Sequence, residues 1–327
     1  MTLILSHKLN ALFTGAFIVT VSLSGCAPVH EEEELESEET EEVQVESKQQ
    51  GLSASYTPSA FTMNDAYNGT SFLGGGCSSF AKQSLIGHEP SATGKYPVAV
   101  WLTGTLADYA GEGALAFTRS MASLGFVAAS VEYTNTTYPS CSALTTRASC
   151  VFNASSASSA IAKLCARSKA DCSKGIVVAG ISQGANLASL AKNYDSRARA
   201  AYLLSNVVTP SFYDNTSCLK DSATSFSASQ VRIVSGESDE YMSGVSETRS
   251  NLVTATGRSC SGNSCLSSDG SGWYIVSNSE VSDGKADHCY LLNGGCNATK
   301  IDPRYETSTA AWSGWTNVLW LAGRIYK

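Results

Sequence analysis

The feature that most constrains the fold is a repeated alternation of short apolar runs with segments of helical spacing. The apolar runs are rich in β-branched and aromatic residues and are bounded by Gly, Ser or Asn, a pattern typical of buried strands. They occupy residues 96–102, 126–133, 175–180, 200–208, 231–236 and 272–277. Helices are predicted between or after them, at residues 113–125, 157–169, 184–195 and 309–327. This alternation favours a mostly parallel sheet with helices on both faces, so we predict an α/β fold.

Two long stretches interrupt the alternation. Residues 134–155 are polar and contain two cysteines, and we interpret them as an insertion or as one wall of a cleft. Residues 251–271 are rich in Ser and Gly and contain another close pair of cysteines, which indicates a surface excursion. Ligands of parallel sheets bind at the carboxyl ends of the strands, where such loops collect.

The acidic residues are concentrated in one segment. The formal net charge is −7, but residues 31–50 alone contain ten Glu and only one basic residue, Lys48. Glutamates this dense repel one another and offer little apolar surface, so we predict a disordered tether at residues 26–50, with a docking or cation-binding tail as the alternative. Because residues 1–50 hold two of the 22 basic and ten of the 29 acidic side chains, residues 51–327 are almost neutral. This balance argues against nucleic acid as a partner of the single large domain expected there.

The N-terminus has the pattern of an export signal. A short positive region precedes an apolar core of about 15 residues, which is short for a membrane span and typical of a signal peptide. The core ends in LSGC, which resembles the lipobox of bacterial lipoproteins. The resemblance implies that residues 1–25 are removed, that Cys26 carries the lipid anchor and that, with Ala27 next, the protein belongs to the outer membrane of the cell envelope. The alternative is an ordinary signal peptide whose first cysteine falls there by chance.

Ten cysteines remain after Cys26, and an even number in an exported chain favours disulfide bonds. Their number does not fix the connectivity, but close couples in the sequence suggest local bonds. The expected pairs are Cys141–Cys150, Cys165–Cys172, Cys260–Cys265 and Cys289–Cys296, with Cys77–Cys218 as a long-range pair. A zinc site is the weaker alternative, because there is no CxxC pair and the chain has only four histidines. We therefore expect no metal.

The motif GISQG places Ser182 between Gly180 and Gly184, at a predicted strand-to-helix junction. A nucleophile elbow needs this setting, because its sharp turn strains the serine backbone and the glycines let the strand and the helix approach each other. A serine that only caps a helix is the alternative. We predict that Ser182 is a nucleophile.

A serine hydroxyl is a poor nucleophile until a base takes its proton. His288 follows the last predicted strand and precedes the last helix, which is where the elbow arrangement expects its base. The acid that orients the base should follow the strand at residues 231–236. Asp239 is our prediction there, with Asp214 and Glu237 as the alternatives.

An oxyanion hole should accompany this set of side chains. One donor is the backbone N–H of Gln183, next to the nucleophile, and the other comes from the loop TGTLADYAG after the strand at residues 96–102. Gly104 lets that loop turn close to a substrate. We predict the N–H of Thr105 as the second donor, with Leu106 as the alternative.

The segments YPVAVWLTGT, MASLGFVAASVEY, GISQG, GESD and DH occur in an order that resembles the α/β-hydrolase fold, over roughly residues 90–327. Their spacing is similar to that of the secreted esterase branch, which includes polyester hydrolases, cutinase-like and dienelactone-hydrolase-like enzymes. The resemblance implies Ser182 as the nucleophile, Asp239 as the acid and His288 as the base, with an acyl-enzyme that water resolves.

The sequence departs from the polyester hydrolases of this branch in two places. Thr105 stands where they carry an aromatic residue, and the segment SNVVTPSFY lacks their tryptophan. Tyr109, Phe212 and Tyr213 are candidates to replace these aromatic groups. Plastic or cutin is therefore not indicated as the substrate.

The expected function is hydrolysis of a small or polymeric ester by a monomer that needs no cofactor and is held at the membrane by its lipid anchor. One alternative is an acyltransferase that uses the same three side chains. The other is a non-catalytic hydrolase-fold lipoprotein that binds a ligand or an envelope partner.

Overall fold

The computed structural model describes residues 53, 55–70, 75–209 and 214–326. The predicted signal peptide, the lipidation site Cys26 and the acidic tether lie outside the described residues, and so do Phe212 and Tyr213. Within the described ranges, none of the helices combines the length and the apolar character needed to cross a membrane.

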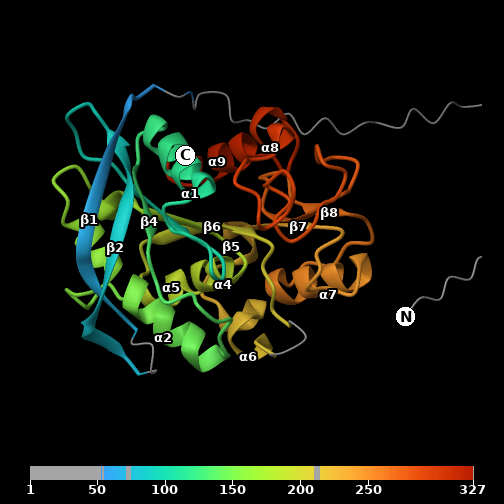
Figure 1. Cartoon of the computed structure of the whole chain (residues 1–327), viewed down its shortest axis with the longest axis horizontal. Helices are drawn as coiled ribbons and strands as arrows, with labels where there is room; N and C mark the ends of the chain where they lie inside the picture. The colour runs from blue at the N-terminus through green and yellow to red at the C-terminus, as the bar shows by residue number, and fades with distance from the viewer. Residues whose placement is uncertain (1–52, 54, 71–74, 210–213, 327) are drawn as a thin grey trace, which may run out of the picture. The chain divides into compact units, whose positions relative to one another are not determined.

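Nine strands of the described chain form one sheet, in the order β1-β2-β4-β3-β5-β6-β7-β9-β8 (Figure 1). Its central strands are mutually parallel, which confirms the predicted mostly parallel sheet. These are β3 (Val98–Leu102), β4 (Val127–Val131), β5 (Ile176–Ile181), β6 (Ala198–Leu204), β7 (Val231–Gly236) and β9 (Gly272–Val276). Each of them lies within or beside one of the apolar runs of the sequence.

The two edges of the sheet are antiparallel. A long hairpin of β1 (Pro58–Thr70) and β2 (Cys77–Pro90) joins β4, and β8 (Ser264–Leu266) joins β9. These strands were not predicted. Most of β1 is exposed or half-buried, so it needs few apolar residues and leaves no continuous apolar run in the sequence.

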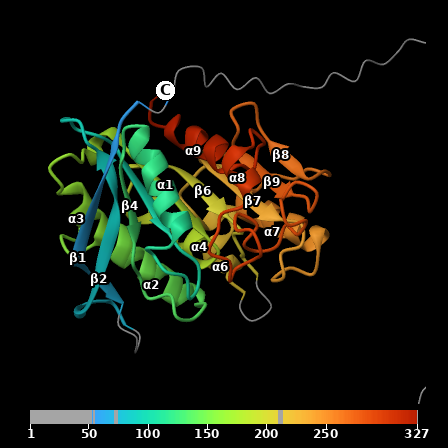
Figure 2. The ribbon, with the colours of Figure 1, turned by 45° about the horizontal axis from the view of Figure 1, so that its top comes forward.

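Both faces of the sheet are buried. Along β3, Val98, Val100 and Leu102 contribute to one hydrophobic core, whereas Ala99 and Trp101 contribute to the other. Helices cover both cores (Figure 1, Figure 2), as predicted. One face carries α1 (Glu112–Ser123), α8 (Pro303–Thr307) and α9 (Gly314–Ala322), and the other carries α2 (Cys141–Phe152), α3 (Ala160–Cys165), α4 (Gln183–Ser189), α5 (Ala191–Tyr194), α6 (Thr216–Leu219) and α7 (Val245–Thr256).

The stretches that interrupted the sequence pattern contain regular structure. Residues 134–155 include α2, in which the buried residues Leu144, Ala148 and Val151 form a stripe at helical spacing. Because Ser and Thr residues surround this stripe, the sequence pattern did not indicate a helix here. The stretch at residues 251–271 begins with the last turns of α7 and also includes β8.

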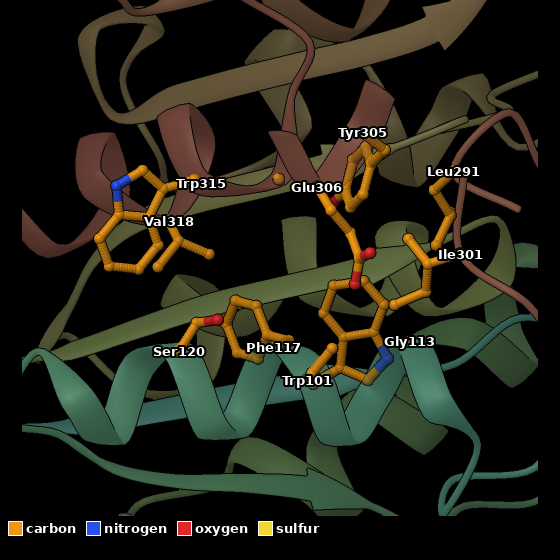
Figure 3. A pocket seen from close by; sticks show the side chains of 12 residues that line it. Trp101, Gly113, Phe117, Ser120, Leu291, Ile301, Tyr305, Glu306, Trp315 and Val318 are labelled. Atoms are coloured by element: carbon orange, nitrogen blue, oxygen red, sulfur yellow. The ribbon is translucent and has the colours of Figure 1, made fainter. Parts of the chain in front are cut away.

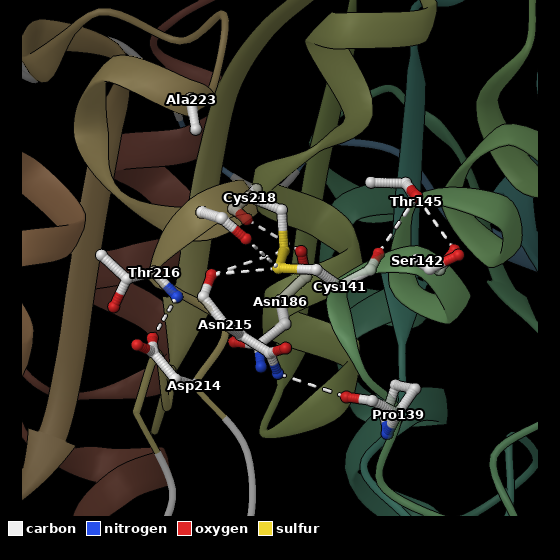
Figure 4. The surroundings of a disulfide bond; sticks show 12 residues. Pro139, Cys141, Ser142, Thr145, Asn186, Asp214, Asn215, Thr216, Cys218 and Ala223 are labelled. Carbon is white, nitrogen blue, oxygen red and sulfur yellow. Dashed lines mark hydrogen bonds between the residues drawn. A yellow bond between two sulfur atoms is a disulfide. The ribbon is translucent and has the colours of Figure 1, made fainter.

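Five disulfides join the ten cysteines of the described chain. The predicted pairs Cys165–Cys172, Cys260–Cys265 and Cys289–Cys296 are confirmed. The predicted pairs Cys141–Cys150 and Cys77–Cys218 are wrong. The actual pairs are Cys77–Cys150 and Cys141–Cys218, the second of which is drawn in Figure 4.

Helix α2 explains the error. Cys141 and Cys150 lie near opposite ends of this helix, and nine residues at a rise of 1.5 Å separate them by roughly 13 Å along its axis. A disulfide needs Cα atoms within about 7 Å of each other, so the two cannot pair. In the actual pairs the Cα atoms are 5.4 and 5.7 Å apart. Both long-range disulfides therefore fasten α2, one to β2 and the other to α6.

We expect the long-range disulfides to stabilise the fold more than the local ones. The double variant Cys141→Ser/Cys218→Ser removes a disulfide whose cysteines are 77 positions apart, and it should lose about 4 kcal/mol of unfolding free energy. The matched variant Cys260→Ser/Cys265→Ser removes a disulfide whose cysteines are 5 positions apart, and it should lose about 2 kcal/mol of unfolding free energy. Urea denaturation of the two variants beside the wild type measures the difference. Equal losses would contradict this ranking.

Candidate active site

The predicted functional side chains collect at one edge of the sheet. Ser182 follows β5, Asp239 follows β7, and His288 lies in the loop after β9. Because these strands are parallel, their carboxyl ends meet at the same edge, and the loops after them can converge on one site.

Ser182 lies at a tight turn between β5 and α4. Its backbone has φ 56° and ψ −125°, a left-handed conformation that costs a residue other than glycine about 1–3 kcal/mol. A Cβ atom at Gly180 would lie 2.6 Å from the backbone of Gly184, and one at Gly184 would lie 2.2 Å from the Leu102 carbonyl oxygen. The strand-to-helix setting predicted for GISQG is therefore present, and both glycines are required by close backbone packing.

His288 and Asp239 form a buried pair. His288 Nδ1 is 2.8 Å from Asp239 Oδ2, and both side chains are almost completely shielded from solvent. The other carboxylate oxygen accepts the Tyr241 N–H at 3.0 Å. When Nδ1 donates to the carboxylate, Nε2 of the neutral imidazole is an acceptor. That nitrogen is buried and has no hydrogen-bond partner among the described residues.

The end of β6 connects the segments that carry Ser182 and His288. The Ser182 N–H donates to the Leu204 carbonyl at 2.9 Å. The next residue, Ser205, donates through its hydroxyl to the His288 carbonyl at 2.7 Å. Ser205 is fully buried and has φ 46°. Sequence reasoning missed it, because a serine after an apolar run carries no signal of this role.

Gly236 lets the histidine loop cross the end of β7. A Cβ atom at Gly236 would lie 2.1 Å from the Ala286 carbonyl oxygen and 2.5 Å from that of Asp287. The Ser238 N–H donates to the Ala286 carbonyl at 2.9 Å, and the His288 N–H donates to the Glu240 carboxylate at 3.0 Å. The glycine in GESD therefore brings the acid loop and the histidine loop into direct contact.

The alternative acids have other partners. Glu237 accepts the Asn278 N–H at 2.6 Å, and Asp214 is exposed and accepts the Thr216 N–H at 2.8 Å. Neither forms a hydrogen bond to His288. The structure therefore brings Asp239, rather than these two acids, to the histidine.

The other histidine in the described ranges lies elsewhere. His88 is on β2, and its Nδ1 is 2.9 Å from Thr118 Oγ1 of α1. Burial and the charge of Arg119 lower the pKa of His88. Its contacts are those of a histidine that packs the hairpin against α1.

The loop after β3 lies against Ser182. A Cβ atom at Gly104 would lie 3.2 Å from Ser182 Cβ. The backbone N–H groups of Thr105 and Gln183 have no acceptor among the described residues, whereas the Leu106 N–H donates to the Asn135 carbonyl at 2.9 Å. Of the two donors considered for this loop, Thr105 is therefore the one that remains open.

Asn135 holds this loop and was missed by sequence reasoning. Its side-chain amide donates to the carbonyls of Gly104 and Ala107, each at 2.8 Å. Together with the Leu106 bond, these contacts fix both ends of the turn. An asparagine within a polar stretch gives no local signal that it reaches back across the sheet edge.

An aromatic side chain borders the buried pair from a position that the sequence did not suggest. The Tyr241 ring packs edge-on against the His288 imidazole, with ring centroids 4.5 Å apart, and Tyr241 is 42% exposed. Burial raises the pKa of the Tyr241 hydroxyl, and the charges of Glu240 and Asp239 add to this effect. Tyr241 thus borders the buried pair with a ring that is partly exposed to solvent.

A separate cavity of about 220 Å³ lies on the α1 and α9 face of the sheet (Figure 3). Trp101, Phe117, Tyr305 and Trp315 line it together with aliphatic side chains. None of its lining residues belongs to the buried pair or to the serine turn. Among the described residues, no group of three or more His, Cys, Asp or Glu side chains could hold a metal ion.

The described geometry supplies the parts of nucleophilic acyl transfer. A serine on a strained turn, a histidine held by a buried carboxylate and two open backbone donors meet at one sheet edge. No protein-family model matches this chain, and no curated protein matches it either.

Replacement of Gly236 should separate the acid loop from the histidine loop. Gly236→Ala places a methyl group against the Ala286 carbonyl, so we expect a loss of about 1–3 kcal/mol of unfolding free energy and a weakened bond between Asp239 and His288. The proton NMR signal of His288 Nδ1–H should shift or broaden. The matched control is Gly262→Ala, where the nearest atom to an added Cβ is 4.0 Å away. An unchanged Nδ1–H signal in Gly236→Ala would refute the proposed role of this glycine.

Proposed function

We propose that this protein is a serine hydrolase that cleaves carboxylic esters through Ser182, His288 and Asp239. The observation that carries the proposal is the 2.8 Å hydrogen bond between buried Asp239 and His288 Nδ1. It leaves Nε2 as an unpaired acceptor at the sheet edge where Ser182 occupies its strained turn. A buried imidazole with one nitrogen fixed and the other unoccupied has the protonation pattern that a general base requires.

In the proposed mechanism these groups catalyse two half-reactions, acylation of Ser182 and hydrolysis of the acyl-enzyme. In the first, Ser182 Oγ attacks the ester carbonyl carbon while His288 Nε2 takes the hydroxyl proton, and the negative charge that develops on the carbonyl oxygen is bound by the N–H groups of Thr105 and Gln183. The tetrahedral intermediate collapses, and His288 gives the proton to the departing alkoxide, which leaves as the alcohol. In the second half a water molecule repeats the attack on the acyl-enzyme, which releases the acid and restores Ser182.

Asp239 has a separate task in this scheme. It accepts the Nδ1–H of His288 and so selects the tautomer that leaves Nε2 unprotonated. It also stabilises the imidazolium that forms when Nε2 takes the serine proton. Its own position is fixed by the Tyr241 N–H on its second oxygen.

We further propose that the chain has the α/β-hydrolase fold. Three features support this assignment: a serine between two glycines at a strand-to-helix turn, the chain order serine, acid, histidine, and an open backbone N–H in the loop after β3. The mostly parallel sheet with helices on both faces is compatible with it.

The proposed place of action is the bacterial cell envelope, with Cys26 as the lipid anchor in the outer membrane. Five disulfides support export, because such bonds persist in oxidising compartments. The signal and the tether lie outside the described residues, so this part of the proposal rests on the sequence.

Hydrolysis of short p-nitrophenyl esters tests the proposed reaction. Ser182→Ala, His288→Gln and Asp239→Asn should each lower kcat/KM by about 10⁴-fold or more, because each removes one part of the proton-transfer system. His88→Gln and Asp214→Asn are the matched controls and should retain wild-type rates, since neither side chain contacts the site. Wild-type turnover no faster than that of Ser182→Ala across acyl lengths would reject the esterase.

A further inference from the structure

Arg147 reaches the side chain of Gln183, directly beside the proposed nucleophile. The Gln183 side chain is fully buried, and its amide lies 2.8 Å from Thr105 Oγ1. The amide orientation that satisfies all neighbours has its nitrogen donating to Thr105 Oγ1 and to the Thr137 carbonyl, and its oxygen accepting from the Arg147 guanidinium. Arg147 also donates to the Thr137 carbonyl at 3.1 Å.

These contacts link the two residues whose backbone N–H groups form the proposed oxyanion hole. Thr105 and Gln183 are 78 positions apart in the sequence, and their side chains bond to each other. Arg147 fixes the Gln183 end of this bridge from a third segment of the chain. The side chains of both residues therefore belong to one hydrogen-bond network that the guanidinium completes.

Among the described residues, the Arg147 guanidinium has no carboxylate partner, and its hydrogen bonds go to this network. Arg147 forms no ion pair within the described part of the chain. It is half-buried, and its partners are the Thr137 carbonyl and the Gln183 amide. Burial lowers the pKa of Arg147, but a guanidinium stays charged at any pH at which the protein is folded.

Helix α2, which carries Arg147, is fastened near both of its ends. The Cys141–Cys218 disulfide ties its first residue to α6 (Figure 4). The Cys77–Cys150 disulfide ties its last turn to β2. Arg147 lies between these two attachments. The helix is thus held in place relative to the sheet edge, and so is the base of the side chain that reaches Gln183.

We propose that Arg147 is a positioning residue of the oxyanion hole, which holds Gln183 and, through it, Thr105 so that both backbone N–H groups face the developing oxyanion. The proposal rests on the proposed ester hydrolysis. It gives the polar stretch at residues 134–155 a part in positioning the oxyanion hole, beyond that of a cleft wall.

Kinetics of the full-length chain on p-nitrophenyl esters test this role. Arg147→Met should lower kcat by about 10- to 100-fold and change KM less than twofold, because donors of an oxyanion hole act on the transition state. Arg147→Lys should recover part of the loss, since an ammonium can donate to the Gln183 oxygen but cannot reproduce the planar fork. The matched control is Arg249→Met, because Arg249 also binds a loop carbonyl, that of Gly262, at 3.1 Å.

Three kinetic results would overturn the proposal: an unchanged kcat in Arg147→Met, a change confined to KM, or an equal loss in Arg249→Met. If thermal unfolding shows that Arg147→Met does not fold, the kcat of Arg147→Lys becomes the test of the proposal. A kcat equal to that of the wild type in this folded variant would then reject the requirement for the guanidinium.

A second measurement separates this proposal from the ester hydrolysis on which it rests. The backbone amide NMR signals of Gln183 and Thr105 should shift or broaden in Arg147→Met and stay unchanged in Arg249→Met, whatever the activity. A wild-type protein without esterase activity would reject the proposed function, and the two amide signals would still test whether Arg147 positions these groups. Unchanged signals in Arg147→Met would overturn the positioning role.

Discussion

The close approach of β3, β5 and α4 is the constraint on which the site depends. Gly180 and Gly184 meet with no room for a side chain, and this contact forces the chain through a turn at which Ser182 adopts a left-handed backbone conformation. The buried sheet around the turn offsets the cost of that conformation. The same contact brings the loop after β3 against Ser182, so the strained turn and the proposed oxyanion donors arise from one packing requirement.

The remaining parts of the site are held by contacts between strand ends. The end of β6 bonds to Ser182 through Leu204 and to His288 through Ser205. The end of β7 lets the histidine loop pass over Gly236 and supplies Asp239. Parallel strands place these ends side by side, which is why side chains far apart in the sequence meet without a long connecting element.

The polar segment between β4 and α3 shows how loops that are far apart in the sequence reinforce one another. Asn135 fixes the loop after β3, and Arg147 holds the Gln183 amide. Disulfides near both ends of α2 tie this segment to β2 and α6. Disulfides and hydrogen bonds, one of them charge-assisted, thus add to the apolar packing of α2 in fixing this edge of the sheet.

The sequence alone determined the α/β class, the position of the parallel strands, the turn at Ser182 and the three local disulfides, because each depends on periodicity or on residues close together in the chain. It also placed Asp239 and His288 correctly relative to the strand ends. Tertiary structure decided the rest. Cys141 and Cys150 cannot pair because a helix separates them. Ser205 bonds to His288, 83 positions away, Asn135 bonds to Gly104, 31 positions away, and Arg147 reaches Gln183, 36 positions away. Contacts over such distances leave no local pattern, since they exist only once the sheet has brought its strand ends together.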